Sequence, residues 1–176
     1  MARVYHGETS LFFGDRLDIF SMDLDQQLQI LIDQAPQDGT MPQVMAQAIA
    51  PVLKAFAQKL QSLEYYVCQS LGGDWLITTL AHQSDPQRTK TVIYGFSTLA
   101  LAQQHQGSSN ADPSLIAVPL PVTHLLFQLF SMAAVDSLII TEAQGSVEIR
   151  RQDLQQAVQQ QLLGDRPRQT PGSQWA

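Results

Sequence analysis

The fold of this chain is decided by residues 65–102, YYVCQSLGGDWLITTLAHQSDPQRTKTVIYGFSTLALA. The runs YYVCQS, DWLITTLAH and KTVIYGF are rich in the β-branched and aromatic residues that favour strands. Gly72-Gly73 and Asp85-Pro86 separate these runs, and such pairs are typical of tight turns. After Ser97-Thr98 the sequence becomes rich in alanine and leucine, which are good helix formers. These residues therefore predict a meander of three strands followed by a helix.

Helical patterns precede this block. Apolar residues recur at steps of three and four in 24–32 and again in 45–63, and Ser21 or Asp23 can cap the first of these helices. Pro51 lies inside the second pattern and should kink or divide that helix, because its ring removes a hydrogen bond. Further on, the same reasoning predicts strands at 115–120, 137–143 and 146–150, and helices from Pro121 and over 151–163. We therefore predict an α+β fold, with a mostly antiparallel sheet of about five or six short strands and helices packed against it.

The composition predicts a single domain with loose ends. A chain of 176 residues, of which 44% are hydrophobic, can bury one core. We expect one α+β domain over residues 1–163, which begins with an apolar N-terminal arm at 1–20, and a disordered tail at 164–176. The sequence has no apolar run of about 18 residues and no apolar stretch typical of a secretory signal, so we expect a cytoplasmic protein.

The charge balance argues against nucleic acid and membranes as partners. The formal net charge is −6, from 10 Lys and Arg against 16 Asp and Glu, and the cations are scattered along the sequence. Binding to nucleic-acid phosphates or to an acidic membrane surface requires clustered cations. Glutamine is abundant, with 25 residues, which indicates either a neutral solvated surface or an adaptable hydrogen-bonding surface for a partner.

The residue types that carry chemistry do not form a catalytic, metal or cofactor motif. The four histidines are His6, His82, His105 and His124. They lack metal-ligand spacing, and we expect each at the surface or at a helix end. Cys68 lies inside a predicted strand without a neighbouring base, which indicates a buried structural thiol. The acids Asp15, Asp18, Asp23 and Asp25 lack the spacing of a calcium loop. We therefore predict a protein that is not an enzyme and that binds no cofactor and no metal.

Four aromatic residues are candidates for contact with a partner. They are Phe12, Phe13, Phe127 and Trp175. The first two belong to the N-terminal arm, Phe127 projects away from the apolar stripe of its helix, and Trp175 lies in the tail, where it has no core to serve. One interpretation is that the arm packs back over the sheet and covers Phe127. The other is that these side chains form an exposed apolar patch or a linear motif for a partner protein.

The stretches GGDWLITTLAH, KTVIYGFSTLALA and VPLPVTHLLFQLFSMAAVDSLIIT resemble the N-terminal domain of the SseB family over roughly residues 73–141. In that family a strand ends in a Phe-(Ser/Thr)-x motif before a helix, which here is Phe96-Ser97-Thr98, and a later helix precedes a strand similar to Asp136 to Thr141. The resemblance implies a non-catalytic protein linked to secretion or enhancement roles. The helix pair before residue 64 and the glutamine-rich last helix depart from the family. The glutamine-rich, lysine-poor composition is also similar to that of small cyanobacterial assembly chaperones, such as those for Rubisco or carboxysome shells.

We therefore expect a non-enzymatic protein-binding module, an assembly factor or chaperone that binds a segment of a partner protein through an apolar surface or a free sheet edge. A homodimer through the same surface is a further expectation. The alternative is a regulatory domain that binds a small ligand, with His82, Arg88 and the loop 105–114, whose composition predicts mobility, near a pocket. A pocket of roughly several hundred Å³ with converging polar groups would favour the alternative, and a flat apolar patch or an open edge would favour the first hypothesis.

Overall fold

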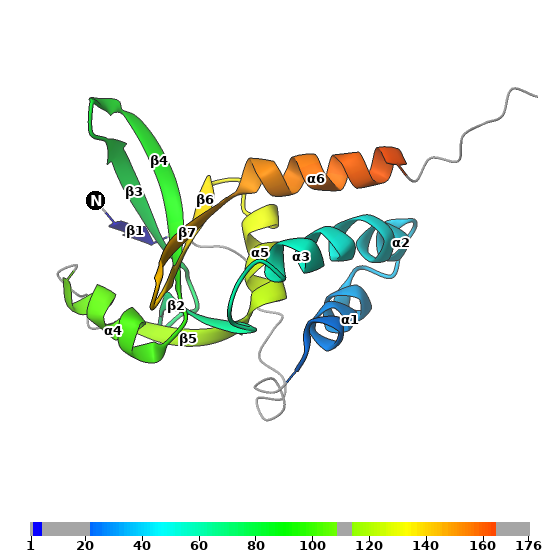
Figure 1. Ribbon diagram of the computed structural model, residues 1–176, viewed down its shortest axis with the longest axis horizontal. Coiled ribbons are helices and arrows are strands. Elements are labelled where there is room, and N and C mark those ends of the chain that lie inside the picture. Colours follow the sequence, from blue (N-terminus) through cyan, green and yellow to red (C-terminus); the bar gives the residue numbers. More distant parts are fainter. Residues whose placement is uncertain (1, 5–21, 109–113, 165–176) are drawn as a thin grey trace, which may run out of the picture.

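The computed structural model describes residues 2–4, 22–108 and 114–164, and in this part of the chain it contains a seven-stranded sheet with helices on both faces (Figure 1). The strands are β1 (Ala2–Val4), β2 (Glu64–Ser70), β3 (Leu76–His82), β4 (Asp85–Phe96), β5 (Leu115–Pro121), β6 (Ser137–Glu142) and β7 (Gly145–Arg150). The helices are α1 (Leu24–Gln34), α2 (Met41–Val44), the π-helical segment η2 (Met45–Ile49), α3 (Ala50–Ala57), α4 (Leu99–Ser108), α5 (Val122–Ser131) and α6 (Arg151–Gly164). Among the described strands all pairs are antiparallel except β4 with β6, so the predicted α+β class is confirmed.

The long strand β4 organises the sheet. On one edge, its residues 92–96 pair in parallel with β6. The other edge carries two strands in succession, since β2 pairs with the end of β4 and β3 pairs with its first half. The three predicted strands therefore exist, but the predicted meander is wrong, because β2 and β3 share only the isolated bridge between Gln69 and Trp75. At 12 residues, β4 is long enough for two shorter strands to lie along one edge.

The first half of β4 and its partner β3 extend away from the body of the protein and form the β3–β4 arm, which we define as residues 79–90 (Figure 1). Just before the β3–β4 arm, residues 76–78 of β3 pair with β1, which was expected only as part of the N-terminal segment 1–20. Among the described strands, β5 pairs only with β2 and so lies at an edge of the sheet, where Pro119 is tolerated.

The helix around Pro51 is divided by a π-helical turn. The N–H of Ala50 bonds to the carbonyl of Met45, five residues back, and Pro51 follows directly. This wider turn accommodates a proline, which cannot donate a hydrogen bond. The helical run ends at Ala57, earlier than the predicted pattern over 45–63, and Leu63 is 47% exposed rather than part of the core.

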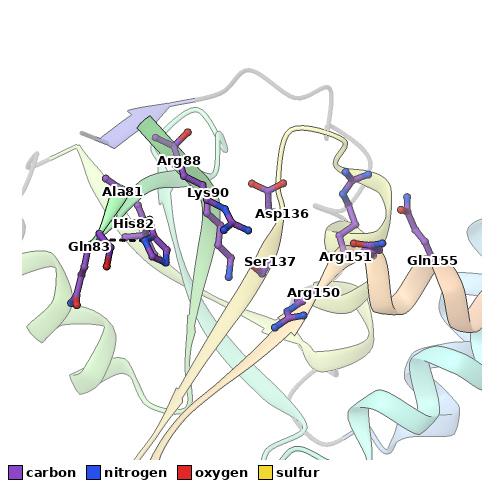
Figure 2. Close-up of a pocket in the computed structure, with 14 residues that line it drawn as sticks. Ala81, His82, Gln83, Arg88, Lys90, Asp136, Ser137, Arg150, Arg151 and Gln155 are labelled. Atoms are coloured by element: carbon purple, nitrogen blue, oxygen red, sulfur yellow. Dashed lines mark hydrogen bonds between the residues drawn. The ribbon is translucent and has the colours of Figure 1, made fainter. Parts of the chain in front are cut away.

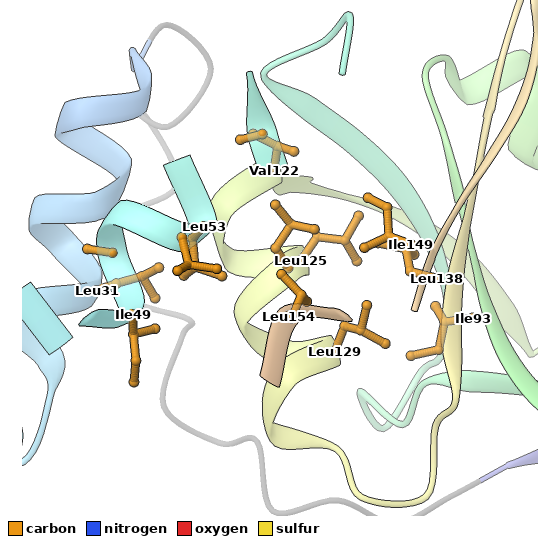
Figure 3. Packing of buried hydrophobic residues seen from close by; sticks show 14 of the residues in the cluster. Leu31, Ile49, Leu53, Ile93, Val122, Leu125, Leu129, Leu138, Ile149 and Leu154 are labelled. Carbon is orange, nitrogen blue, oxygen red and sulfur yellow. The ribbon is translucent and has the colours of Figure 1, made fainter. Parts of the chain in front are cut away.

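The main core lies between one face of the sheet and the helices α1, α3, α5 and α6 (Figure 3). Helix α5 is central and packs closely on β4, where Gly95 leaves room for it. A Cβ atom at Gly95 would lie 2.8 Å from Ile140 Cδ1 and 3.3 Å from Leu125 Cδ2. On the opposite face α4 covers a smaller cluster around Cys68 and Phe96, so the predicted burial of the Cys68 thiol is confirmed.

A buried amide joins α1 to α5. The side chain of Gln27 is 1% exposed and donates from Nε2 to the carbonyls of Met22 (3.3 Å) and Leu63 (3.0 Å). Its Oε1 accepts from the N–H (3.3 Å) and the hydroxyl (3.1 Å) of Thr123. All hydrogen-bonding positions of the amide are therefore used. Asp23 caps the same helix through a capping box with Gln26, which confirms one of the two predicted caps.

Candidate functional site

A polar groove of about 1120 Å³ lies between the β3–β4 arm and the start of α6 (Figure 2). On the side of the arm it is lined by Leu80, Ala81, His82, Gln83, Ser84, Arg88, Thr89 and Lys90. On the other side it is lined by Asp136, Ser137, Arg150, Arg151, Gln152 and Gln155. The groove therefore combines two parts of the sequence that are almost fifty residues apart, and we call it the arm groove.

The arm is fixed to the body where β6 begins. The carboxylate of Asp136 accepts hydrogen bonds from the N–H and the hydroxyl of Thr91, both at 2.8 Å, and the N–H of Asp136 donates to the Thr91 carbonyl at 2.9 Å. The backbone N–H of Thr91, with help from its hydroxyl and from nearby Arg151 and Lys90, holds the pKa of Asp136 below its ordinary value of 3.8. The carboxylate is thus ionised at neutral pH and stabilises the base of the arm.

The arm groove gathers most of the described cations of an acidic protein. Residues 22–108 and 114–164 contain six Lys and Arg residues, and four of these line the groove. Two carboxylates offset them in part: Asp136, and Glu148, which forms an ion pair with Lys90 and lies 3.8 Å from Arg150 Nε. Four positive charges against two negative charges leave the groove positive, although the chain carries a net charge of −6.

Two polar groups in the groove have unused hydrogen-bonding capacity within the described residues. Arg88 is exposed and forms no ion pair there. The hydroxyl of Ser137 is buried without a partner at hydrogen-bond geometry, although it lies close enough to Glu148 to help to lower the pKa of that carboxyl. Arg151 is more constrained, since its Nε donates to the Val135 carbonyl at 2.8 Å. Of these groups, the exposed guanidinium of Arg88 is the one that a bound anion can reach.

The structure brings together only some of the residues that the small-ligand hypothesis had grouped. His82 and Arg88 line the arm groove, as the small-ligand hypothesis predicted. The loop 105–114 does not join them in the described residues, because 105–108 belong to α4 and do not line the groove, while 109–113 lie outside the described residues.

The four aromatic residues predicted to contact a partner do not form a common surface among the described residues. Phe127 is half-buried and packs against the main core, so the structure does not present it as a free aromatic side chain. Phe12, Phe13 and Trp175 lie outside the described residues. The acids Asp15 and Asp18 and the histidine His6 also lie outside them.

Two of the histidines are more buried than predicted. His105 lies in the last turn of α4, as predicted, but its ring also packs on Tyr94 and Phe96, with ring centroids 4.6 and 5.0 Å apart, so it is half-buried. Burial lowers its pKa. Burial also lowers the pKa of His124 to about 4. Both imidazoles are therefore neutral at physiological pH, and neither lies in the arm groove.

The sequence analysis missed the clustering of Lys90, Arg150, Arg151 and Asp136. These residues were seen as scattered because the contacts that join them depend on the parallel pairing of β4 with β6 and on the hairpin of β6 and β7. The pair Arg150-Arg151 at the start of a predicted helix was the only sequence signal. Among the described residues, no cluster of three or more His, Cys, Asp or Glu side chains could hold a metal ion, and no helix is long and apolar enough to cross a membrane.

Comparison of the chain with protein-family models, with curated proteins and with solved structures finds no match. The resemblance to the SseB family over residues 73–141 therefore stays a prediction.

Proposed function

We propose that this protein is a non-enzymatic protein-binding module, in the manner of an assembly factor or chaperone, and that it holds a segment of a partner protein in the arm groove. One observation carries the proposal. Four of the six Lys and Arg residues in 22–108 and 114–164 converge on one open groove, although the chain as a whole is acidic. Clustered charge on an otherwise opposite background steers and orients a partner.

The shape of the groove favours a chain segment over a small molecule. Sites for small molecules are mostly enclosed and apolar, with volumes of about 300–1000 Å³. The arm groove is polar rather than apolar, and its wall at residues 81–84 and 88–89 is exposed, so the groove is open rather than enclosed. Its cations are long side chains on two strands, β4 and β7, and at the start of α6, which suits contacts spread along a peptide.

Charge reversal tests this function. We expect the double variant Arg88→Glu/Arg150→Glu to lose the partner in affinity capture from the source cells, because both exposed guanidinium groups line the groove. The matched control is Lys54→Glu/Lys59→Glu, which changes the net charge equally but lies outside the groove on and after α3. Equal capture by the wild type and both variants, at equal melting temperatures, would contradict the proposal.

A second candidate, a regulatory domain that binds a small anionic ligand, is favoured by the exposed Arg88 guanidinium, which forms no ion pair among the described residues and lies among other cations of the groove. Inorganic phosphate is a suitable probe. The candidate requires phosphate to raise the melting temperature of the wild type, since a ligand of the native state stabilises it. The same addition should leave Arg88→Glu/Arg150→Glu unchanged. A flat response of the wild type up to millimolar phosphate removes this candidate.

A further inference from the structure

We propose that the segment held in the arm groove is acidic and extended, and that it binds by adding a strand to the open edge of β4, in line with β6. This inference rests on the proposed function and specifies the chemistry of the partner. It is carried by two independent features: the direction of the backbone groups of β4 in the arm, and the cations that flank this edge.

The open edge follows from the hydrogen bonds of Thr91. Both the N–H and the carbonyl of Thr91 point toward Asp136, on the side of β6. In an antiparallel pair, residues direct their two backbone groups alternately to one edge and to the other. Thr89, two positions earlier in the same strand, therefore presents its N–H and carbonyl to the same side as Thr91. Its pairing with Ala81 of β3 is of the kind that leaves these groups free.

This edge has no strand partner beyond Thr91 in the described part of the chain. The pairing of β6 with β4 begins at Ser137 opposite Val92, and Asp136 occupies the position next to it. The N–H of Gln87 is already used by the Asp85 carboxylate at 3.2 Å. The groups that remain for a partner strand are the N–H and the carbonyl of Thr89, since the regular β3–β4 register ends at the pair of Ala81 and Thr89.

The charges around the edge select an acidic segment. Arg88 and Lys90 belong to the same strand as Thr89, and Arg150 and Arg151 stand on the opposite wall of the groove (Figure 2). A strand added along β4 would run between these walls. Its side chains alternate in direction, so carboxylates at every second position would face the cations. Charge-assisted hydrogen bonds to Arg88 and Arg150 would then supplement the backbone bonds of Thr89.

The edge strand β5 is less suited to the same use. Pro119 and Pro121 are two positions apart and therefore direct their nitrogens to the same side of β5. A proline nitrogen cannot donate a hydrogen bond, so this side of β5 lacks two backbone donors. The β4 edge retains the donor of Thr89 and has the cations beside it. Strand addition at β4 thus combines a backbone template with a charge that recognises the partner.

The test uses the full chain, labelled with ¹⁵N, and three synthetic peptides. The first is an extended peptide of about eight residues, slightly longer than an average strand, in which Glu alternates with Val or Thr. The second has Lys in place of Glu. The third is the acidic peptide with N-methyl groups on alternate amides, which removes its backbone donors on one edge. We expect the acidic peptide to shift the amide resonance of Thr89, and the other two to bind at least about tenfold more weakly.

The variant Thr89→Pro provides a second measurement. Because the Thr89 N–H does not face β3, proline should leave the β3–β4 pairing intact and remove only the outward donor. We expect it to weaken binding of the acidic peptide by about five- to tenfold, the effect of one lost hydrogen bond. If this variant fails to fold, the comparison of the acidic and the N-methylated peptide on the wild type still decides the question.

Five outcomes would overturn the inference. Equal binding of the acidic and the N-methylated peptide would exclude strand addition, and equal binding of the Lys peptide would exclude the acidic preference. Shifts confined to β7, for example at Val147, would place the peptide at the wrong edge. If the acidic peptide does not bind while Arg88→Glu/Arg150→Glu still abolishes partner capture, the inference fails and the proposed function stands. If capture is also unaffected, both fail.

Discussion

The buried amide of Gln27 allows a stability prediction that can be worked out group by group. In Gln27→Leu the side chain keeps its approximate size but loses all four hydrogen bonds. The Leu63 carbonyl keeps a partner, because it also accepts from the Val122 N–H at 2.9 Å. The N–H of Thr123, which is fully buried, loses its partner, and the Thr123 hydroxyl keeps only a long contact of 3.5 Å with His124 Nδ1. At about 1.5 kcal/mol for each of these two buried groups, we expect a loss of about 3 kcal/mol.

A double-mutant cycle with Thr123→Val separates this mechanism from a general packing defect. The single variant Thr123→Val removes one hydrogen bond from Gln27 and should cost about 1 kcal/mol. In Gln27→Leu/Thr123→Val no hydroxyl is left without a partner. The double variant should therefore be about 1–2 kcal/mol more stable than the sum of the two single effects predicts.

Urea unfolding followed by circular dichroism measures these free energies, provided that the m-value stays constant. The matched control is Gln34→Leu, the same exchange at an exposed position of α1, which should stay within about 0.5 kcal/mol of the wild type. An effect of Gln27→Leu as small as that of the control, or strict additivity in the cycle, would refute the reasoning.

Three further predictions concern other contacts. Asp136→Asn should lower the free energy of unfolding by about 0.5–1 kcal/mol at neutral pH, allowing for solvent screening. Because the folded pKa of Asp136 lies below 3.8, the stabilisation by its carboxylate is present above that value and is lost as the pH falls through the lowered pKa. The unfolding curves of the variant and the wild type should therefore converge in acid. His124→Gln should make the stability of the protein depend less on pH in acid. Because burial lowers the pKa of His124 to about 4 from 6.5, the unfolded chain binds a proton that the folded protein excludes, which costs the wild type about 2 kcal/mol at about pH 5. An equally steep dependence of the unfolding free energy on pH in the variant would contradict this. Gly95→Ala should destabilise the protein by about 1–3 kcal/mol in thermal unfolding, because the Cβ of the alanine would lie 2.8 Å from Ile140 Cδ1 in a packed core. An unchanged melting temperature would show that the side chains of Ile140 and Leu125 can move aside.

The fold class could be predicted from the sequence because its signals are local. Strand runs such as KTVIYGF, the cap at Asp23 and the break at Pro51 each act on their own segment, and each is found where it was predicted. The order of the strands depends on which edge of β4 each strand occupies. Nothing local indicates that β2 leaves β4 after Val67 and that β3 continues along the same edge.

The candidate site could be predicted only in part for the same reason. His82 and Arg88 are close in sequence to a turn and were grouped with a pocket on that basis, and both line the arm groove. Asp136, Arg150 and Arg151 come from a later part of the chain and reach the groove through the β4–β6 pairing. Conversely, the apolar pattern of its helix predicted that Phe127 projects away from the core, but this side chain is half-buried and packs against the core.

Because the two walls of the arm groove come from distant parts of the chain, they form at different times during synthesis and folding. The β3–β4 arm is a local hairpin and can form soon after residue 90 has left the ribosome. Its opposite wall requires β6, β7 and the first turns of α6, up to Gln155. Pairing over such a separation in sequence forms late, because the intervening loop must close first. A nascent chain therefore displays the arm long before it has a complete groove, and a partner that needs both walls can be engaged only after nearly all of the domain has been synthesised.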